Sequence, residues 1–361
     1  MTEYDIVLNF EWIHNSHIHK YLAFSKSLNR FCKCLLVINN GKLGITEEYK
    51  RQFKDEDVKG VIFCGMDAAA KLLEKLKYKI YVSSSAGSKS NRYWVNVAGK
   101  KSTTVIISDF MGDAGYCRLF NIYSLINPIM IKTVGYRPTN IWFSNCLLWD
   151  NISDCLPYSL TKTEFCDKYS LDPKKDIFLW MPDGIQCQKG LAIEVYKKVC
   201  SLDNVIIKLH PNEYSRNKAD MVNNKWSYDL YADKKVTVLN TIDTHWAYTY
   251  ADCGFSHTSA VGLEFPIYKK PFVYVDHPSL GGNKDLPYDT WVRLNKEHFG
   301  GEFSWVGGSC SCSDLHNFVN EKKYVVPYNL YNEHMKKFLA FPEKRAIDVL
   351  TEQLIGLLGK K

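Results

Sequence analysis

Two stretches in the second half of the chain decide the fold: Asn204-Val-Ile-Ile-Lys-Leu-His-Pro211 and Ala251-Asp-Cys-Gly-Phe-Ser-His-Thr-Ser-Ala260. The first is an apolar run that ends in a lysine and a His-Pro pair. The proline ends a strand because it has no backbone N–H to donate. The second is a short apolar run followed by small hydroxyl residues and a helical pattern. A strand that ends in a polar turn and continues into a helix is typical of parallel sheets.

Short β-branched runs alternate with helical patterns along the rest of the chain. The first half predicts a helix at Asp67–Lys77 and strands at Asp5–Asn9, Leu35–Ile38, Gly60–Cys64, Lys79–Ser83, Thr103–Ser108 and Asn140–Ser144. A polar, turn-prone stretch follows Asp150 and extends through Asp172–Lys175. The second half then predicts helices at Gly190–Ser201, Asp243–Tyr250 and Ser259–Phe265, the last stopped by Pro266, and strands at Ile177–Met181, Val205–Lys208, Lys235–Leu239, Ala251–Phe255 and Pro271–Val275.

Two successive β-α-β series predict an α/β protein of the GT-B architecture, with two Rossmann-like domains facing each other across a cleft. At 361 residues the chain also exceeds the usual size of a single hydrophobic core. We expect an N-terminal domain over residues 1–150 and a C-terminal domain over residues 151–340. Residues 341–361 are expected to form a helix that braces the first domain. Attachment of this amphipathic segment to a membrane is the alternative.

The composition is 46% hydrophobic and 24% charged, which is typical of a globular protein. Apolar runs such as Val61–Cys64 are too short to span a bilayer, and Met1–Asp5 has no signal-peptide pattern. We therefore expect a cytoplasmic protein, with a peripheral position at the inner face of the membrane as a further option. The net charge of +7 is scattered and forms no basic stripe with interleaved aromatics, which argues against a nucleic-acid partner.

The twelve cysteines do not predict a metal site. Cys32/Cys34 and Cys310/Cys312 are separated by one residue, whereas paired zinc ligands are usually two to four residues apart. Reduced thiols that fill the cores are expected instead. No Asp-x-Asp pair ends a predicted strand, so we expect neither a metal nor a cofactor.

Lys208, His210 and Pro211 lie at the carboxyl end of a predicted strand, where ligands of doubly wound sheets bind. Pro211 holds His210 in an extended conformation. The imidazole can donate a hydrogen bond to a phosphate oxygen or protonate a leaving group. A structural histidine is the alternative at this position.

Ser256, His257, Thr258 and Ser259 form the turn between the next strand and its helix. Hydroxyl residues there cap the helix and leave backbone N–H groups free to bind a phosphate or diphosphate. An ordinary helix cap would have the same residues. Glu264 falls farther along the helix, where its carboxylate could reach a ribose; a solvated helix charge is the alternative.

In their order and spacing, these stretches resemble the donor domains of the CDP-glycerol glycerophosphotransferases and related capsule and teichoic-acid transferases. Lys208-Leu-His210-Pro211, Asp252 through Ser259, Glu264 and Lys270-Pro271 are similar to that family's motifs. A similar His-Pro and Ser/Thr arrangement occurs in bacterial sialyl-, polysialyl- and Kdo-transferases, which use CMP-sugars. The family's second serine is Ala260 here and His257 is additional, so the transferred group stays open. The resemblance covers roughly residues 172–278.

A transferase of this kind needs a catalytic base near the acceptor hydroxyl, on the N-terminal side of the cleft. Asp109 follows a predicted strand, and Asp113 lies in the glycine-containing loop after it. We rank these two carboxylates above the alternative cluster of Glu11, His14, His17 and His19, which follows the first strand.

The resemblance implies a glycosyltransferase-type enzyme that moves a sugar or glycerol-phosphate group from a nucleotide-activated donor to a surface polysaccharide or glycolipid acceptor. CDP- and CMP-linked donors are favoured, with His210, Asp109 and Asp113 as catalytic residues. Two other functions stay open: an epimerase of the UDP-N-acetylglucosamine 2-epimerase type, and a non-catalytic binding module that has kept the fold.

Overall fold

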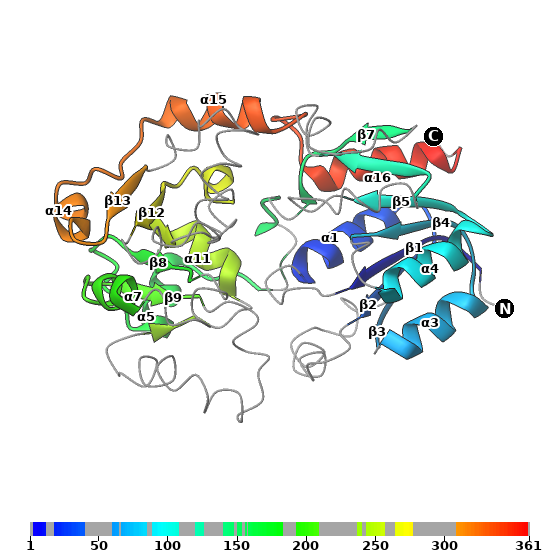
Figure 1. The fold of residues 1–361 in the computed structure, drawn as a ribbon, viewed down its shortest axis with the longest axis horizontal. Helices are drawn as coiled ribbons and strands as arrows, with labels where there is room; N and C mark the ends of the chain where they lie inside the picture. Colours follow the sequence, from blue (N-terminus) through cyan, green and yellow to red (C-terminus); the bar gives the residue numbers. More distant parts are fainter. Residues whose placement is uncertain are drawn as a thin grey trace. The chain divides into compact units, whose positions relative to one another are not determined.

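A computed structural model describes residues 3–11, 18–39, 60–64, 66–84, 89–107, 120–125, 140–147, 150–153, 156, 158–182, 193–208, 237–239, 243–256, 264–276 and 308–359. The chain divides into two compact units (Figure 1). Unit 1 comprises Met1–Tyr158 and Lys336–Lys361, and unit 2 comprises Ser159–Met335. The boundaries predicted from the sequence were residues 150 and 340.

Unit 1 contains a seven-stranded sheet in the order β3-β2-β1-β4-β5-β6-β7, in which every pair of neighbours is parallel. The strands are β1 (Glu3–Glu11), β2 (Cys34–Asn39), β3 (Val61–Cys64), β4 (Lys77–Ser83), β5 (Thr103–Ile107), β6 (Ile122–Leu125) and β7 (Ile141–Phe143). The order runs outward in one direction from β1 and in the other from β4. The reversal between β1 and β4 makes this a doubly wound sheet.

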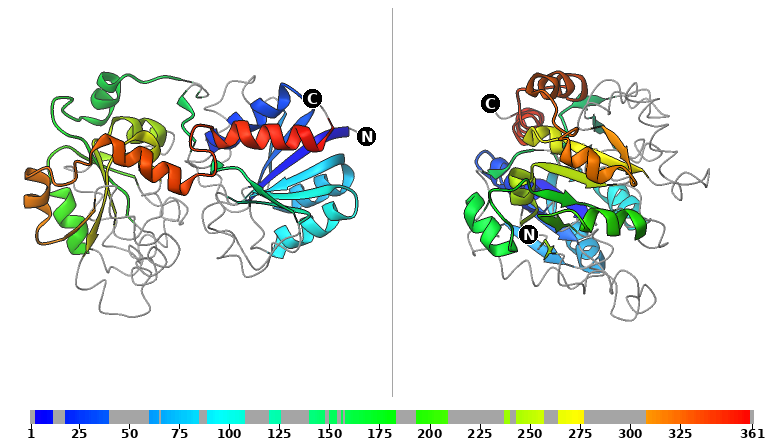
Figure 2. Two further views of the ribbon diagram at one scale, coloured as in Figure 1. Left: turned by 90° about the horizontal axis from the view of Figure 1, so that it is seen from above. Right: turned by 90° about the vertical axis from the view of Figure 1, so that its left-hand side faces the viewer.

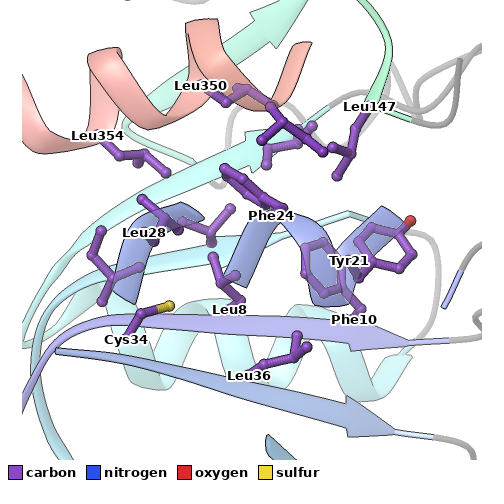
Figure 3. Close-up of a cluster of buried hydrophobic side chains, with 14 of the residues drawn as sticks. Leu8, Phe10, Tyr21, Phe24, Leu28, Cys34, Leu36, Leu147, Leu350 and Leu354 are labelled. Atoms are coloured by element: carbon purple, nitrogen blue, oxygen red, sulfur yellow. The ribbon is translucent and has the colours of Figure 1, made fainter. Parts of the chain in front are cut away.

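Helices cover both faces of this sheet (Figure 2). Helices α1 (Ile18–Asn29) and α16 (Ala346–Leu357) pack together on one face, while α3 (Met66–Lys75) and α4 (Lys89–Gly99) lie on the other. Leu8 and Phe10 of β1 meet Phe24, Leu28, Leu350 and Leu354 in the core beneath α1 and α16 (Figure 3). Cys32 and Cys34 belong to the same core. Because side chains alternate along a strand, Val7 and Asn9 point to the face of α3 and α4.

Two residues near position 150 hold the last helix in unit 1. Asp150 is buried and accepts hydrogen bonds from the N–H groups of Ala346 (2.7 Å) and Ile347 (2.8 Å), the first two residues of α16. The amide of Asn145 donates to the carbonyl oxygens of Phe341 (2.7 Å) and Lys344 (2.8 Å). The helix start is therefore capped by a carboxylate from a distant part of the chain.

The Asp150 cap predicts a pH dependence of stability. Burial raises the pKa of Asp150 from 3.8 to about 6, although the two N–H groups act in the opposite direction. The native state thus binds the proton more tightly than the unfolded chain. This stabilisation is complete below about pH 4 and is lost as the pH rises through 6, a change on the order of 3 kcal/mol. We expect urea titrations at pH 4 and pH 7 to show this loss in the wild type relative to Asp150→Asn. Parallel pH profiles of the two proteins would contradict it.

Unit 2 contains a six-stranded parallel sheet in the order β10-β9-β8-β11-β12-β13, with the reversal between β8 and β11. The strands are β8 (Phe178–Trp180), β9 (Val205–Ile207), β10 (Thr237–Val238), β11 (Cys253–Ser256), β12 (Phe272–Asp276) and β13 (Ser309–Ser311). One face carries an apolar core that includes Trp180, Phe255 and the buried Cys310 and Cys312. The helical segments are α5 (Lys162–Tyr169), α7 (Ile193–Cys200), α11 (Thr244–Tyr250), the 3-10 helix η8 (Phe265–Tyr268), α14 (Leu315–Asn320) and α15 (Tyr328–Phe338).

All eleven strands predicted from the sequence are present, with ends within two residues of the prediction. Strands β6 and β13 were not predicted. β13 has a single buried side chain, Cys310, between two exposed serines, and so lacks an apolar pattern. The stretch read as polar and turn-prone contains α5, whose start is fixed by a capping box between Thr161 and Glu164. Among the described residues, no helix has the length and apolarity needed to cross a bilayer.

Most of the helix predicted at Ser259–Phe265 stays a prediction, and only the role given to Pro266 is wrong. Residues 257–263 lie outside the described part, and the segment that follows is the 3-10 helix η8, in which Pro266 occupies the first turn instead of ending the helix. A proline is tolerated there because the first N–H groups of a helix have no intrahelical partner.

Candidate functional site

Three strand ends meet at the reversal of the sheet in unit 2. Trp180 of β8 is in register with Ile207 of β9 and Phe255 of β11. The next residues, Met181, Lys208 and Ser256, therefore lie level with one another at the carboxyl edge. The backbone ladder continues to this level: Lys208 N–H donates to the oxygen of Trp180, and Met181 N–H donates to that of Phe255, both at 2.9 Å.

Lys208 and Ser256 are close because only β8 separates their strands. With a strand spacing of ~4.8 Å, their Cα atoms lie roughly 10 Å apart. Lys208 is 6% exposed and Ser256 is fully buried. A lysine is rarely buried this far, since its ammonium must leave water. The reversal point of the sheet therefore has one positive charge and one hydroxyl group set into its edge.

Phe265, the first residue of η8, packs directly on the sheet. Its ring lies so close to Gly254 that an added Cβ atom would be 2.4 Å from Cζ. The same ring packs against Tyr248 of α11 and Phe272 of β12, with centroid distances of 5.2 and 5.3 Å. Gly254 and Ser256 point to the same face because they are two residues apart on one strand. Phe265 thus sits on the face of the sheet toward which Ser256 points.

Glu264, the residue before Phe265, is buried and only 4% exposed. It is the N-cap residue of η8, not a residue inside a helix, and the alternative of a solvated helix charge is wrong. Burial, and after it the negative charge of Glu264, raise the pKa of the Tyr248 hydroxyl. The carboxylate therefore lies near Tyr248, in the layer of aromatic rings that covers Gly254.

Residues of α11 that were not predicted as part of a site belong to this aromatic layer. His245 is buried, and its Nδ1 lies 3.0 Å from the hydroxyl of Tyr268. Tyr268 also packs against Tyr248, with ring centroids 5.5 Å apart. The density of aromatics in Thr244-His-Trp-Ala-Tyr-Thr-Tyr250 was the available signal. Sequence alone does not show that this helix packs against η8.

Several predicted site residues lie outside the described part of the chain. They are His210, Pro211, His257, Thr258 and Ser259 in unit 2, and Asp109 and Asp113 in unit 1. Their roles stay predictions. Of the alternative cluster in unit 1, His19 is buried on α1. In the ranges that the structure describes, no group of three or more His, Cys, Asp or Glu side chains is placed to hold a metal ion.

Lys208, Ser256 and Glu264 are the predicted donor-site residues that the structure describes. Lys208 and Ser256 lie at the carboxyl edge of one sheet, and Glu264 precedes the ring that packs on Gly254 of the same sheet. A lysine can offset the charge of a phosphate, and a hydroxyl can hydrogen-bond to it. A carboxylate accepts hydrogen bonds from ribose or sugar hydroxyls. The edge therefore has the groups that a phosphorylated, hydroxyl-bearing ligand requires.

Comparison with solved structures identifies the architecture. The chain is similar to the UDP-GlcNAc 2-epimerase of Methanocaldococcus jannaschii (TM-score 0.61, 12% identity), covering 98% of this chain and 99% of that one. It is also similar to the wall teichoic acid polymerase TagF (TM-score 0.60, 11% identity), covering 98% of this chain and 89% of that one. A third similar structure is that of S. aureus MnaA with UDP, at 10% identity and a TM-score of 0.55, covering 88% of this chain and 96% of that one.

No protein-family model matches the chain, and no curated protein matches its sequence. The chain has the GT-B fold, with one parallel α/β sheet in each of two domains, as predicted. At these identities the likeness shows the fold alone.

The contact between Gly254 and Phe265 is testable. We expect Gly254→Ala to lower the unfolding free energy by about 1–3 kcal/mol, because the added methyl group overlaps a buried ring that cannot swing into solvent. Urea denaturation measures the change. Gly356→Ala is the matched control: no atom lies within 4 Å of its added Cβ, and alanine favours the helix α16 by about 0.5–1 kcal/mol. A Gly254→Ala protein as stable as the wild type would contradict the contact.

Proposed function

We propose that unit 2 binds a nucleotide-activated donor at the carboxyl edge of its sheet, and that the protein transfers a sugar or glycerol-phosphate group from that donor. The observation that carries the proposal is the burial of Lys208 and Ser256 at the reversal between β8 and β11, with the buried Glu264 next to the ring that covers Gly254. Doubly wound sheets bind nucleotides at this point. The lysine can bind a phosphate, and the glutamate can accept hydrogen bonds from hydroxyl groups.

In this proposal the phosphates of the donor lie near Lys208 and the turn that begins at Ser256. Glu264 accepts hydrogen bonds from the ribose, and His210, with Pro211, follows Lys208 at the same edge. His257, Thr258 and Ser259 complete the turn. As nucleotide leaves, positive charge and hydrogen-bond donors at this edge offset the negative charge that develops on the phosphate.

The acceptor is proposed to be a surface polysaccharide or a glycolipid, with Asp113 or Asp109 as the base that removes the proton from its hydroxyl group. CDP- and CMP-linked donors are favoured on the resemblance of the Lys208–Pro211 and Asp252–Ser259 stretches to transferases that use them. A peripheral position at the inner face of the membrane would bring the enzyme to a lipid-linked acceptor. No metal or other cofactor is part of the proposal.

An epimerase is the second candidate function. The observation in its favour is that the similar structures include UDP-GlcNAc 2-epimerases as well as TagF, with nearly equal TM-scores. Incubation of the protein with UDP-N-acetylglucosamine alone separates the two functions. An epimerase converts the sugar without an acceptor, which NMR of the anomeric protons detects, whereas a transferase leaves its configuration unchanged.

Nucleotide binding can be tested by thermal unfolding in the presence of CMP, CDP, UDP and GDP. A nucleotide at one hundred times its Kd stabilises the native state by about 2.7 kcal/mol, so we expect a higher Tm with a cytidine nucleotide. Lys208→Met should lose this increase because the buried positive charge is removed. The control is Lys174→Met, which changes an exposed lysine in the turn before β8 and should keep it. No response to any of the four nucleotides would overturn the donor site.

The catalytic role of His210 predicts a second, separate result. With a cytidine-activated donor, we expect His210→Ala to lower turnover by about 10²–10⁴-fold, the usual contribution of a general acid or base, at an unchanged Tm. Release of CMP or CDP measures turnover. A folded variant with wild-type turnover would exclude this role. A wild-type protein that binds nucleotide and releases none would favour a non-catalytic module.

A further inference from the structure

A second reversal point, in unit 1, carries a polar residue that no function described so far uses. Asn9 of β1 is in register with Ser83, the last residue of β4, and with Val37 of β2 on its other side. Strands β1 and β4 flank the point at which the order of this sheet reverses. Ligands of doubly wound sheets bind outside the carboxyl ends of the strands at such a point.

The side chain of Asn9 is fully buried, and only one of its two polar atoms has a hydrogen-bond partner. Its Nδ2 donates a hydrogen bond of 2.8 Å to the hydroxyl of Tyr81. Its Oδ1 has no hydrogen-bond donor in the structure of the described residues. Native proteins pair nearly all buried polar groups, since an unpaired one costs free energy, so an exception needs a specific cause. Asn9 lies two residues before the end of β1 and level with the end of β4, at the reversal point, and a ligand bound there would supply such a cause.

The neighbours of Asn9 limit which chemical group can pair with its side-chain oxygen. Val37, its partner on β2, offers only an apolar side chain. Rotation of the amide by 180° would let Oδ1 accept from Tyr81, but Nδ2 would then be the unpaired end. A hydroxyl group fits both orientations because it can donate to an oxygen and accept from an N–H. Ser83, also fully buried and one strand away, places a protein hydroxyl beside the same position.

We propose that Asn9 binds a hydroxyl group of a sugar or polyol ligand that enters unit 1 at the carboxyl ends of β1 and β4. The ligand's hydroxyl completes the hydrogen bonding of the Asn9 amide beside Ser83, and the bond of that amide to Tyr81 fixes its plane. The proposal concerns unit 1 alone and does not rest on nucleotide binding by unit 2.

The test measures the affinity and the stability of one variant together. The probes are N-acetylglucosamine and ribitol, and their Kd is obtained by saturation-transfer NMR titration of the full chain. We expect Asn9→Leu to weaken binding of a probe about three- to tenfold, the worth of one hydrogen bond. Its unfolding free energy in urea should stay within about 1 kcal/mol of the wild type, because removal of a buried unpaired oxygen offsets the lost hydrogen bond to Tyr81.

Two further variants keep the outcome decisive. Gln353→Met is the matched control: the Gln353 amide donates to the oxygen of Phe143 at 2.9 Å and also has a buried oxygen for which the described structure supplies no donor. This hydrogen bond reaches β7, which is four strand spacings from β1 in the sheet. Replacing Gln353 should therefore leave probe binding unchanged. Asn9→Ala replaces Asn9→Leu if leucine does not fit. Because alanine leaves a cavity at this buried position, only the Kd of Asn9→Ala, and not its stability, is compared with the wild type. Three results would overturn the proposal. The wild type could bind neither probe, or an Asn9 variant could bind a probe as tightly as the wild type, which would leave a buried water as the partner of the amide. The third is that Asn9→Leu loses stability and binding together.

Discussion

Both units depend on the parallel pairing of their strands. Every pair of neighbours in the two sheets is parallel, so all carboxyl ends of a sheet lie at one edge. In unit 2 the backbone hydrogen bonds run one residue past β8 and β9, which holds Met181 and Lys208 level with Ser256. Polar residues that end a strand are therefore gathered at this edge, while the strand interiors stay apolar. In doubly wound sheets generally, ligands bind at the point where the strand order reverses.

The polar groups at these edges are buried at a cost, and apolar packing offsets it. Phe265 lies directly on Gly254 and packs between Tyr248 and Phe272, which carries Glu264 into the same layer. A side chain at position 254 would push the ring away from the sheet. The glycine is thus the condition under which the Phe265 ring can lie on this face of the sheet, with Glu264 next to it in the chain. In unit 1, Asn9 is likewise a polar residue that is fully buried at the reversal point of its sheet.

The C-terminal helix α16 belongs to unit 1 because side chains of that unit hydrogen-bond to the backbone at and before its start. Asn145 and Asp150 bind backbone groups between Phe341 and Ile347, about two hundred residues later in the sequence. Helix α16 then places Leu350 and Leu354 in the core beside α1 (Figure 3). Its apolar side is used within the protein, so packing and not membrane attachment accounts for the amphipathic pattern of this segment.

The sequence by itself determined the α/β class, eleven of the strands and the GT-B architecture, because buried parallel strands leave a local signal of β-branched runs ended by polar turns. It also singled out Lys208, Ser256 and Glu264 from their places at strand ends. Only the tertiary structure decided that Glu264 is buried, that α11 joins its aromatic layer and that Asn9 lies beside Ser83. These facts depend on strand order, strand register and the packing of α11 against η8, which bring together residues distant in the sequence and which no local pattern encodes.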